Sequence, residues 1–193
     1  MKNKIILIGG SAGSFSVVTQ ILTELPKNFR IPIVLCLHRL KHVRSGFAEA
    51  LSLKSSNPVI EPYDKDRIEE GKIYIAPANY HLYIEAHKHF ALSTEDSINH
   101  SRPSIDVTFV STASVYKENV IAIILSGANN DGAYGIKRVK DLGGITIVQN
   151  PEECQVSTMP VSSIRIMKPD FILSSTEIIK YLIDINNKAF FGK

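Results

Sequence analysis

The chain opens with a short apolar segment, residues 5–8, that breaks into the glycine- and serine-rich residues 9–14. We expect a strand that turns sharply into a helix here, because glycines on both sides of Ser11 tolerate the positive φ that a tight bend requires. Such a bend lifts the Ser11 hydroxyl out at the carboxyl end of the strand, where open α/β sheets place their sites. Residues 9–13 also match the G-x-S-x-G nucleophile elbow, a pattern with only three fixed letters.

Beyond this opening, apolar stretches of strand length alternate with segments of helical length, which is typical of βαβ units. We predict further strands at 31–37, 59–60, 72–76, 120–125 and 145–149. The predicted helices are 16–25, 47–53, 104–116, 134–142 and 175–185. The pattern predicts a doubly wound α/β fold with a mainly parallel sheet flanked by helices and an antiparallel hairpin near residues 81–92. No linker or repeat divides the chain, so we expect one domain over residues 1–193.

Composition limits the class of protein. The 193 residues, 44% of them hydrophobic, suffice for one sizeable core, and no apolar run is long enough for a membrane helix or a cleaved leader. We therefore expect a soluble, cytoplasmic protein that is not inserted in a membrane. The net charge of +3 is spread along the chain, with a small cluster at 39–44, and gives little support for nucleic acid as a partner. Cys36 and Cys154 lack C-x-x-C spacing and are expected to be buried free thiols.

Three polar residues follow predicted strands at the same edge of the sheet: Ser11, His38 and Asp131. A serine hydroxyl is a weak nucleophile, a histidine can take its proton, and a carboxylate can hold the imidazole in the useful tautomer. Each residue also has a simpler interpretation. Ser11 could cap the following helix, His38 could be a strand-end residue satisfied by hydrogen bonds, and Asp131 could be a turn residue or helix N-cap.

The six histidines also raise the question of a metal site. His81, His87 and His89 lie in or near the predicted hairpin, but no carboxylate or cysteine stands near them with metal-ligand spacing. We expect these side chains to be exposed and polar, and no metal ligand is predicted.

Several motifs in order give the chain a resemblance to the catalytic domain of the CheB family, the chemotaxis receptor protein-glutamate methylesterases. They cover nearly the whole length and are I-G-G-S-A-G-S at the start, H-R-L at 38–40, S-G-F-A-E-A-L at 45–51, G-K-I-Y-I-A-P-A-N-Y-H-L at 71–82, R-P-S-I-D-V at 102–107, L-S-G-A-N-N-D-G at 125–132 and Q-N-P-E-E-C-Q-V-S-T-M-P at 149–160.

The resemblance implies a hydrolase that removes methyl esters from receptor glutamates, releases methanol and deamidates certain receptor glutamines. By motif, Ser11 would be the nucleophile, His38 the general base and Asp131 its orienting carboxylate. No cofactor is implied. The partners implied are methyl-accepting chemotaxis receptors. We expect backbone N–H groups at Ala12 and Ala128 to stabilise the oxyanion, since both border the strand ends near Ser11.

The chain also departs from the family pattern. We expect no receiver domain of the kind usual in the family, so a separate regulatory protein is a candidate partner. Ala12 stands where threonine is common, Ala128 where methionine is common, and residues 39–40 replace a Met-Pro pair. We expect these changes to affect substrate preference. Arg102 fits the family, and we expect it to have a structural or substrate-orienting role.

Two other functions stay open at this point. The loop at 9–14 could present a helix N-terminus to an anion, which would make the chain a nucleotide-binding or regulatory module, although neither G-K-[ST] nor G-x-G-x-x-G is present. Alternatively, the chain could be a degenerate relative that docks on receptors without turnover. Saturable nucleotide binding would indicate the first, and receptor binding without methanol release the second.

Overall fold

The computed structural model describes residues 3–38 and 46–191. The helices are α1 (Ser14–Glu24), α2 (Phe47–Ser52), α3 (Ile105–Tyr116), α4 (Ala133–Asp141), α5 (Thr158–Ile166) and α6 (Ser175–Phe191). The strands are β1 (Ile5–Gly10), β2 (Ile33–Leu37), β3 (Val59–Ile60), β4 (Ile73–Ile75), β5 (His81–Glu85), β6 (His89–Ser93), β7 (Val120–Ile124), β8 (Ile145–Gln149) and β9 (Phe171–Leu173). Across the described residues, no helix is both long and apolar enough to cross a bilayer.

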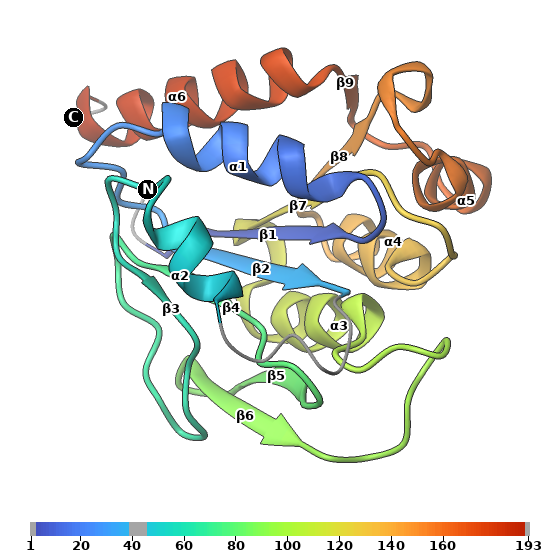
Figure 1. The fold of residues 1–193 in the computed structure, drawn as a ribbon, viewed down its shortest axis with the longest axis horizontal. Coiled ribbons are helices and arrows are strands. Elements are labelled where there is room, and N and C mark those ends of the chain that lie inside the picture. Colours follow the sequence, from blue (N-terminus) through green and yellow to red (C-terminus); the bar gives the residue numbers. More distant parts are fainter. Residues whose placement is uncertain (1–2, 39–45, 192–193) are drawn as a thin grey trace.

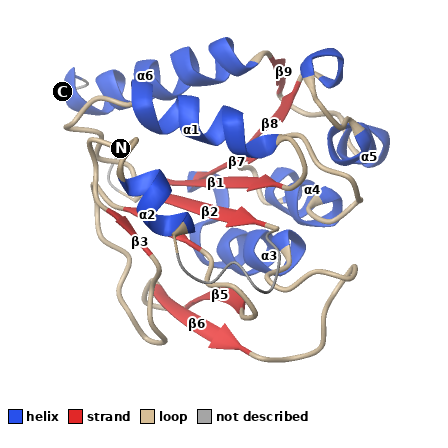
Figure 2. Ribbon diagram, viewed as in Figure 1, coloured by secondary structure: helices blue, strands red, loops and turns tan. Residues whose placement is uncertain are grey.

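Seven of these strands form one parallel sheet in the order β3-β4-β2-β1-β7-β8-β9. The remaining two, β5 and β6, make a separate antiparallel pair in which His81 lies opposite Ser93. In Figure 2 helices lie on both sides of the main sheet, and the hairpin stands apart from it. The predicted doubly wound α/β fold with a hairpin near residues 81–92 is confirmed.

Two apolar cores lie on the two faces of the sheet. Alternate residues of β1 point into them, Ile6 and Ile8 into the core beneath α1 and α6, and Ile5 and Leu7 into the core beneath α3 and α4. Figure 1 shows α1 and α6 together on one side and α3, α4 and the hairpin on the other. Because both faces are covered, the central strands are continuous apolar runs rather than alternating ones.

The topology places the carboxyl ends of β1, β2 and β7 side by side. From β1 the chain adds strands on one side, and later returns to build the other side beginning with β7. A crevice forms outside the carboxyl ends where the order reverses, and ligands of open α/β proteins bind there. Ser11 follows β1, His38 follows β2, and Asp131 lies in the loop after β7, as the sequence predicted.

One α-helix and one strand were not predicted, and one α-helix is longer than predicted. Helix α5 contains Pro160 in its first turn, where the missing N–H has no helical partner to lose. Strand β9 has three residues at the sheet edge, and two of them are exposed. Helix α6 continues to Phe191, beyond the predicted end at residue 185.

The expectation that His81 is exposed is wrong, because its side chain is fully buried. The Ser104 N–H donates to His81 Nδ1 at 3.2 Å, and His81 Nε2 lies 3.0 Å from the Asp96 carbonyl oxygen. Since Nδ1 accepts, the proton is on Nε2 and the ring is neutral. His87 is exposed as expected, whereas His89 is half-buried.

The expectation for the two thiols is half right. Both cysteines are thiols, but only Cys36 is buried. Cys154 is partly exposed, and partial burial raises the pKa of its thiol to about 11.

Candidate active site

Ser11 is held by backbone hydrogen bonds to the strand end next to β1. Its N–H donates to the Ser126 carbonyl at 2.9 Å, just beyond β7, and its own carbonyl accepts from the Ser14 N–H at 3.0 Å. Helix α1 has Gly13 as its N-cap, without a side-chain cap. Ser11 therefore does not cap this helix. Among the described residues its hydroxyl has no hydrogen-bond partner.

The glycines around Ser11 serve different purposes. Only Gly13 has the positive φ that we expected, at +82°. Gly10 continues the strand, and a Cβ there would stand 2.6 Å from the Cβ of Ser14. Gly10 is thus required for close packing against the start of α1 rather than for a left-handed bend.

His38 and Asp131 are in direct contact. The His38 Nε2 lies 2.8 Å from Asp131 Oδ2, and the two side chains are 12% and 0% exposed. The backbone N–H of His38 donates to the Gly10 carbonyl at 3.1 Å, which fixes the end of β2 against the end of β1. The strand ends therefore bring His38 to Asp131 and place its backbone beside the residue that precedes Ser11.

The Asp131 carboxylate is surrounded by donors from the start of α3. Oδ2 accepts from the Ile105 N–H at 2.7 Å, and Oδ1 accepts from the Ser104 hydroxyl at 2.9 Å and the Asp106 N–H at 3.2 Å. A helix N-terminus favours negative charge because its first N–H groups have no helical partner. Asp131 is also not the N-cap of α4, since Gly132 takes that position.

These contacts determine the charge on Asp131. Burial alone would raise the pKa of its carboxyl, but hydrogen bonds from His38, the Ile105 N–H and Ser104 outweigh burial and hold the pKa below its ordinary value. Asp131 is therefore ionised at neutral pH and accepts the proton on His38 Nε2. The other ring nitrogen, Nδ1, then carries the free lone pair and is the basic atom of the site.

That basic nitrogen faces a serine that the sequence did not indicate. Ser101 Oγ lies 3.2 Å from His38 Nδ1, and Asn129 Nδ2 donates to Ser101 Oγ at 3.4 Å. Within residues 3–38 and 46–191, no hydrogen bond joins Ser11 to His38. Ser101 belongs to no motif or strand end, and only the fold brings it to the imidazole.

A second carboxylate lies beside the first. Asp106 Oδ1 accepts from the Gly135 N–H at 2.6 Å, and the Asn99 amide donates both to Asp106 Oδ2 at 3.1 Å and to Asp131 Oδ1 at 3.3 Å. Burial raises the pKa of Asp106 to about 6, and the charge of Asp131 adds to this effect against the opposing Gly135 hydrogen bond. The carboxyls of Asp106 and Asp131 therefore have very different pKa values.

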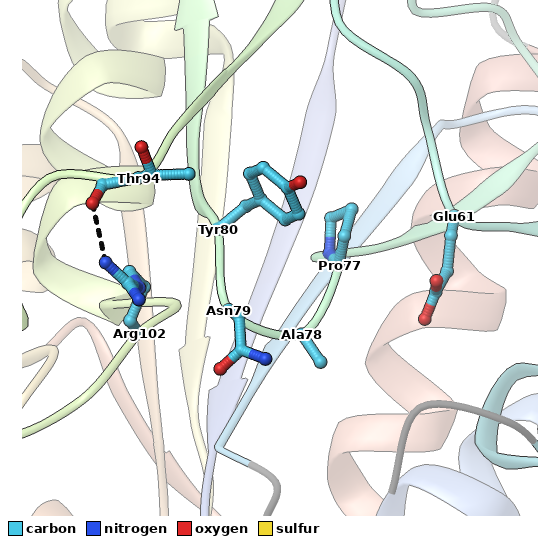
Figure 3. A pocket seen from close by; sticks show the side chains of 7 residues that line it. All are labelled: Glu61, Pro77, Ala78, Asn79, Tyr80, Thr94 and Arg102. Carbon is cyan, nitrogen blue, oxygen red and sulfur yellow. Dashed lines mark hydrogen bonds between the residues drawn. The ribbon is translucent and has the colours of Figure 1, made fainter. Parts of the chain in front are cut away.

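Arg102 closes the loop that carries Ser101. Its Nη1 donates to the carbonyl oxygens of Thr94 at 2.6 Å and Glu95 at 2.8 Å, so the end of residues 94–102 is tied to their beginning (Figure 3). Its Nε is buried without a partner among the described residues. These contacts support the structural role among the two expected for Arg102.

A cleft of about 500 Å³ adjoins Arg102 at the carboxyl edge of the sheet. Figure 3 shows Arg102 at one end of its lining and Glu61 at the other. Pro77, Ala78, Asn79 and Tyr80 lie between them, and Thr94 lies beside Arg102. Arg102, which lines this cleft, directly follows Ser101, whose hydroxyl contacts His38.

The two proposed oxyanion donors lie on the exposed side of the site. Ala12 and Ala128 are both exposed, and neither backbone N–H donates a hydrogen bond to a described residue. The Ser126 hydroxyl donates to the Ala12 carbonyl at 2.7 Å, which connects the loops after β1 and β7. The substituted residues 39–40 and the basic cluster at 39–44 lie outside the described residues, and the described ones contain no group of three His, Cys, Asp or Glu suited to a metal ion.

A parallel α/β sheet with an ionised carboxylate, a histidine and a serine hydroxyl at neighbouring strand ends is an arrangement of the kind that serine hydrolases use. The chain matches the CheB methylesterase family over residues 6–182 and belongs to that family.

Individual relatives are similar over most of the chain. A Leptospira interrogans protein is 39% identical over 97% of this chain and 98% of its own length. A Thermotoga maritima protein-glutamate methylesterase/protein-glutamine glutaminase is 35% identical over 96% of this chain, which spans 55% of that longer protein. The crystal structure of the Thermotoga maritima CheB methylesterase catalytic domain superposes with a TM-score of 0.90 at 36% identity, over 96% of this chain and 100% of that one.

Proposed function

We propose that this chain is a single catalytic domain, residues 1–193, that hydrolyses methyl esters of glutamate side chains on chemoreceptors and releases methanol. The observation that carries the proposal is the 2.8 Å contact between His38 and the ionised Asp131, with Ser11 at the adjacent strand end and its hydroxyl unpartnered among the described residues. The relatives named as protein-glutamate methylesterases supply the substrate class.

In the proposed mechanism Ser11 Oγ attacks the ester carbonyl while His38 Nδ1 takes its proton. Asp131 stabilises the imidazolium through Nε2. The N–H groups of Ala12 and Ala128 would donate to the oxyanion of the tetrahedral intermediate, because neither donates to a described residue and both border the loop that carries Ser11. The protonated imidazole then passes its proton to the leaving methoxide. Water, activated by the same nitrogen, hydrolyses the acyl-enzyme to the carboxylate.

The same steps would deamidate a glutamine, since an amide differs from the ester only in its leaving group. Relatives carry the name protein-glutamine glutaminase alongside methylesterase. The cleft beside Arg102 offers room for peptide that flanks the reacting side chain. We propose cytoplasmic receptor segments as the substrates.

The test is methanol release from a methylated chemoreceptor cytoplasmic fragment. We expect release by the native chain and loss of most activity in Ser11→Ala and in His38→Ala. Ser16→Ala is the matched control, because Ser16 lies exposed in α1 and should leave the rate unchanged. Circular dichroism establishes that each variant is folded.

Other outcomes would point elsewhere. Receptor binding without methanol release from any form of the chain would make it a docking protein. Release that persists in Ser11→Ala would remove Ser11 from the mechanism. Saturable nucleotide binding without hydrolysis would favour the anion-binding alternative.

The oxyanion assignment has its own test. Replacing Ala12 with proline removes one N–H, and we expect the rate of methanol release to fall by about 100- to 1000-fold. Unchanged circular dichroism and unchanged receptor-fragment binding serve as controls. Full activity in a folded Ala12→Pro variant would show that this N–H is not a donor to the oxyanion.

A further inference from the structure

The segment 94–102 leads from the end of β6 to the start of α3 and places a hydroxyl on the basic nitrogen of His38. Its residues 94–100 are exposed, so packing against the core does not hold them. Hydrogen bonds hold them instead, and three of these contacts determine where Ser101 lies. Each ties a different part of the segment to itself or to the site.

The first contact is a tight turn at its tip. The N–H of Ser101 donates to the Ile98 carbonyl at 2.9 Å, and the N–H of Ile98 donates to the Ser101 carbonyl at 3.2 Å. The two residues between them, Asn99 and His100, both have positive φ, at 50° and 62°. Positive φ at both central positions matches the twist of a hairpin and fixes the direction in which Ser101 leaves the turn.

The second and third contacts anchor the turn. Arg102 ties its end to the carbonyls of Thr94 and Glu95, and the Asn99 amide donates to Asp131 Oδ1 at 3.3 Å. The Arg102 hydrogen bonds therefore hold the two ends of the segment together. The Asn99 hydrogen bond connects its tip to Asp131, the carboxylate that orients His38. The same segment thus contacts both members of the pair: Ser101 contacts the imidazole of His38, and Asn99 contacts Asp131.

The direction of the Ser101 hydrogen bond follows from the ring's other partner. Because ionised Asp131 accepts the proton on Nε2, Nδ1 is an acceptor, and the Ser101 hydroxyl donates to it across 3.2 Å. The same hydroxyl also lies 3.4 Å from the Asn99 carbonyl oxygen, a longer contact than that to Nδ1. The lone pairs of Ser101 Oγ remain free to accept from Asn129 Nδ2 at 3.4 Å. Ser101 thus uses the lone pair that must take the proton of Ser11 during catalysis.

We propose that Ser101 is a positioning residue that occupies the basic nitrogen of His38 in the resting site and must yield it to Ser11 when a substrate is attacked. The inference rests on the proposed function of Ser11 and His38 and goes beyond it by assigning a competitor for the base. A neutral hydrogen bond of ordinary strength corresponds to about a fivefold effect on a rate.

The test measures the reactivity of Ser11 with a fluorophosphonate probe. In that reaction Ser11 Oγ forms a bond to phosphorus, fluoride leaves, and the hydroxyl proton passes to His38. We expect Ser101→Ala to be labelled about fivefold faster than the native chain. Ser101→Thr keeps the hydroxyl and should retain the native rate. Ser97→Ala is the matched control, because Ser97 is exposed in the same segment and its hydroxyl has no partner among the described residues.

Peptide mass spectrometry locates the label. Labelling of Ser11 together with the faster rate in Ser101→Ala supports the proposal. An unchanged or slower rate in that variant overturns it, because Ser101 would then be neutral or helpful at the base. Labelling of Ser101 itself would also overturn it, since Ser101 would be acting as a nucleophile.

A second measurement does not depend on catalysis. In protein labelled with ¹⁵N-histidine, the Nδ1 resonance of His38 should shift in Ser101→Ala and stay in place in Ser97→Ala. An unchanged resonance overturns the proposal even if Ser11 is reactive. If Ser11 is not labelled in any form of the chain, the proposed function fails, and this spectrum still decides whether Ser101 binds Nδ1.

Discussion

Asp131 shows how much of the site depends on single residues. Its carboxylate receives hydrogen bonds from His38, Ser104, Asn99 and the N–H groups of Ile105 and Asp106. These donors stabilise the ionised form and no other, since a neutral side chain of the same shape cannot accept from all of them. The negative charge in turn determines which nitrogen of His38 is basic.

We expect Asp131→Asn to lower the rate of methanol release by about 1000- to 10,000-fold, because the amide cannot hold the proton on Nε2 of the imidazole. The variant should also be less stable, since its NH₂ group opposes donors from α3. Asp184→Asn, an exposed change in α6, is the control. A folded Asp131→Asn protein with native turnover would show that this carboxylate does not orient the base.

His81 is a second residue whose environment predicts a large effect. His81→Ala would leave a cavity between the hairpin and α3 and would remove the acceptor of the Ser104 N–H. We expect a loss of about 3 kcal/mol in the free energy of unfolding, measured by urea denaturation. His89→Ala, in the paired strand and half-buried, should lose clearly less. Equal losses would contradict a special role for the buried ring.

The sequence was sufficient to nominate Ser11, His38 and Asp131, because each follows a strand whose apolar pattern is strong. It was not sufficient to find Ser101 or Asn99, which lie in a segment without periodicity. Their position depends on a turn whose two left-handed residues, Asn99 and His100, are not glycines, so the sequence does not mark it as a turn. The buried state of His81 was missed for a related reason, since the partners that satisfy its ring lie 15 and 23 residues away in sequence.

At the level of elements, helices α1, α2 and α4 begin in the same way. Each has a left-handed glycine as its N-cap, namely Gly13, Gly46 and Gly132. The surroundings of these glycines differ sharply. A Cβ on Gly132 would stand 2.7 Å from both Ile105 Cγ2 and Ile124 Cδ1, whereas a Cβ on Gly46 would meet no atom of the described residues within 4 Å.

This contrast predicts different costs for the same substitution. Gly46→Ala should lower the free energy of unfolding by about 1 kcal/mol, because only the positive φ is unfavourable. Gly132→Ala adds a clash inside the core and should lose about 3 kcal/mol or more. Urea denaturation of the two variants measures the difference. If both lose the same amount, packing around Gly132 is not what requires glycine there.

Long apolar strands and helices with clear ends were predicted to within a few residues, including the Ser104 N-cap of α3. Apart from the end of α6, the errors concern elements whose stability comes from their neighbours. Helix α5 is rich in serine and β-branched residues and has a proline in its first turn, so its local preference is weak. Strand β9 exists because Phe171–Leu173 continues the ladder of β8 at the sheet edge.

At the scale of the whole molecule, Asp106 and Asp131 act on stability in opposite directions. The lowered pKa of Asp131 contributes stability that is present above the ordinary carboxyl range and lost as pH falls through the native pKa. The raised pKa of Asp106, about 6, contributes stability that is present below pH ~4 and lost as pH rises through 6. Between pH 4 and 6 the Asp106 contribution therefore declines.

We expect Asp106→Asn to remove this decline. The difference in free energy of unfolding between the native chain and the variant should change between pH 4 and 6 and be constant above pH 7. Chemical denaturation at a series of pH values measures it. Asp184→Asn should run parallel to the native curve throughout. A constant difference for Asp106→Asn across the window would show that this carboxyl titrates normally in the folded protein.

The central position of β1 has a consequence for the order of events during synthesis. Ile5 pairs with Val120, so the second neighbour of β1 leaves the ribosome more than a hundred residues after β1 itself. At a translation rate of about 5–20 residues per second, one edge of the apolar strand β1 stays unpaired for several seconds until β7 is synthesised. Nascent chains stalled before β7 should therefore be bound by chaperones and cut readily by proteases, and release of the segment through β8 should end both.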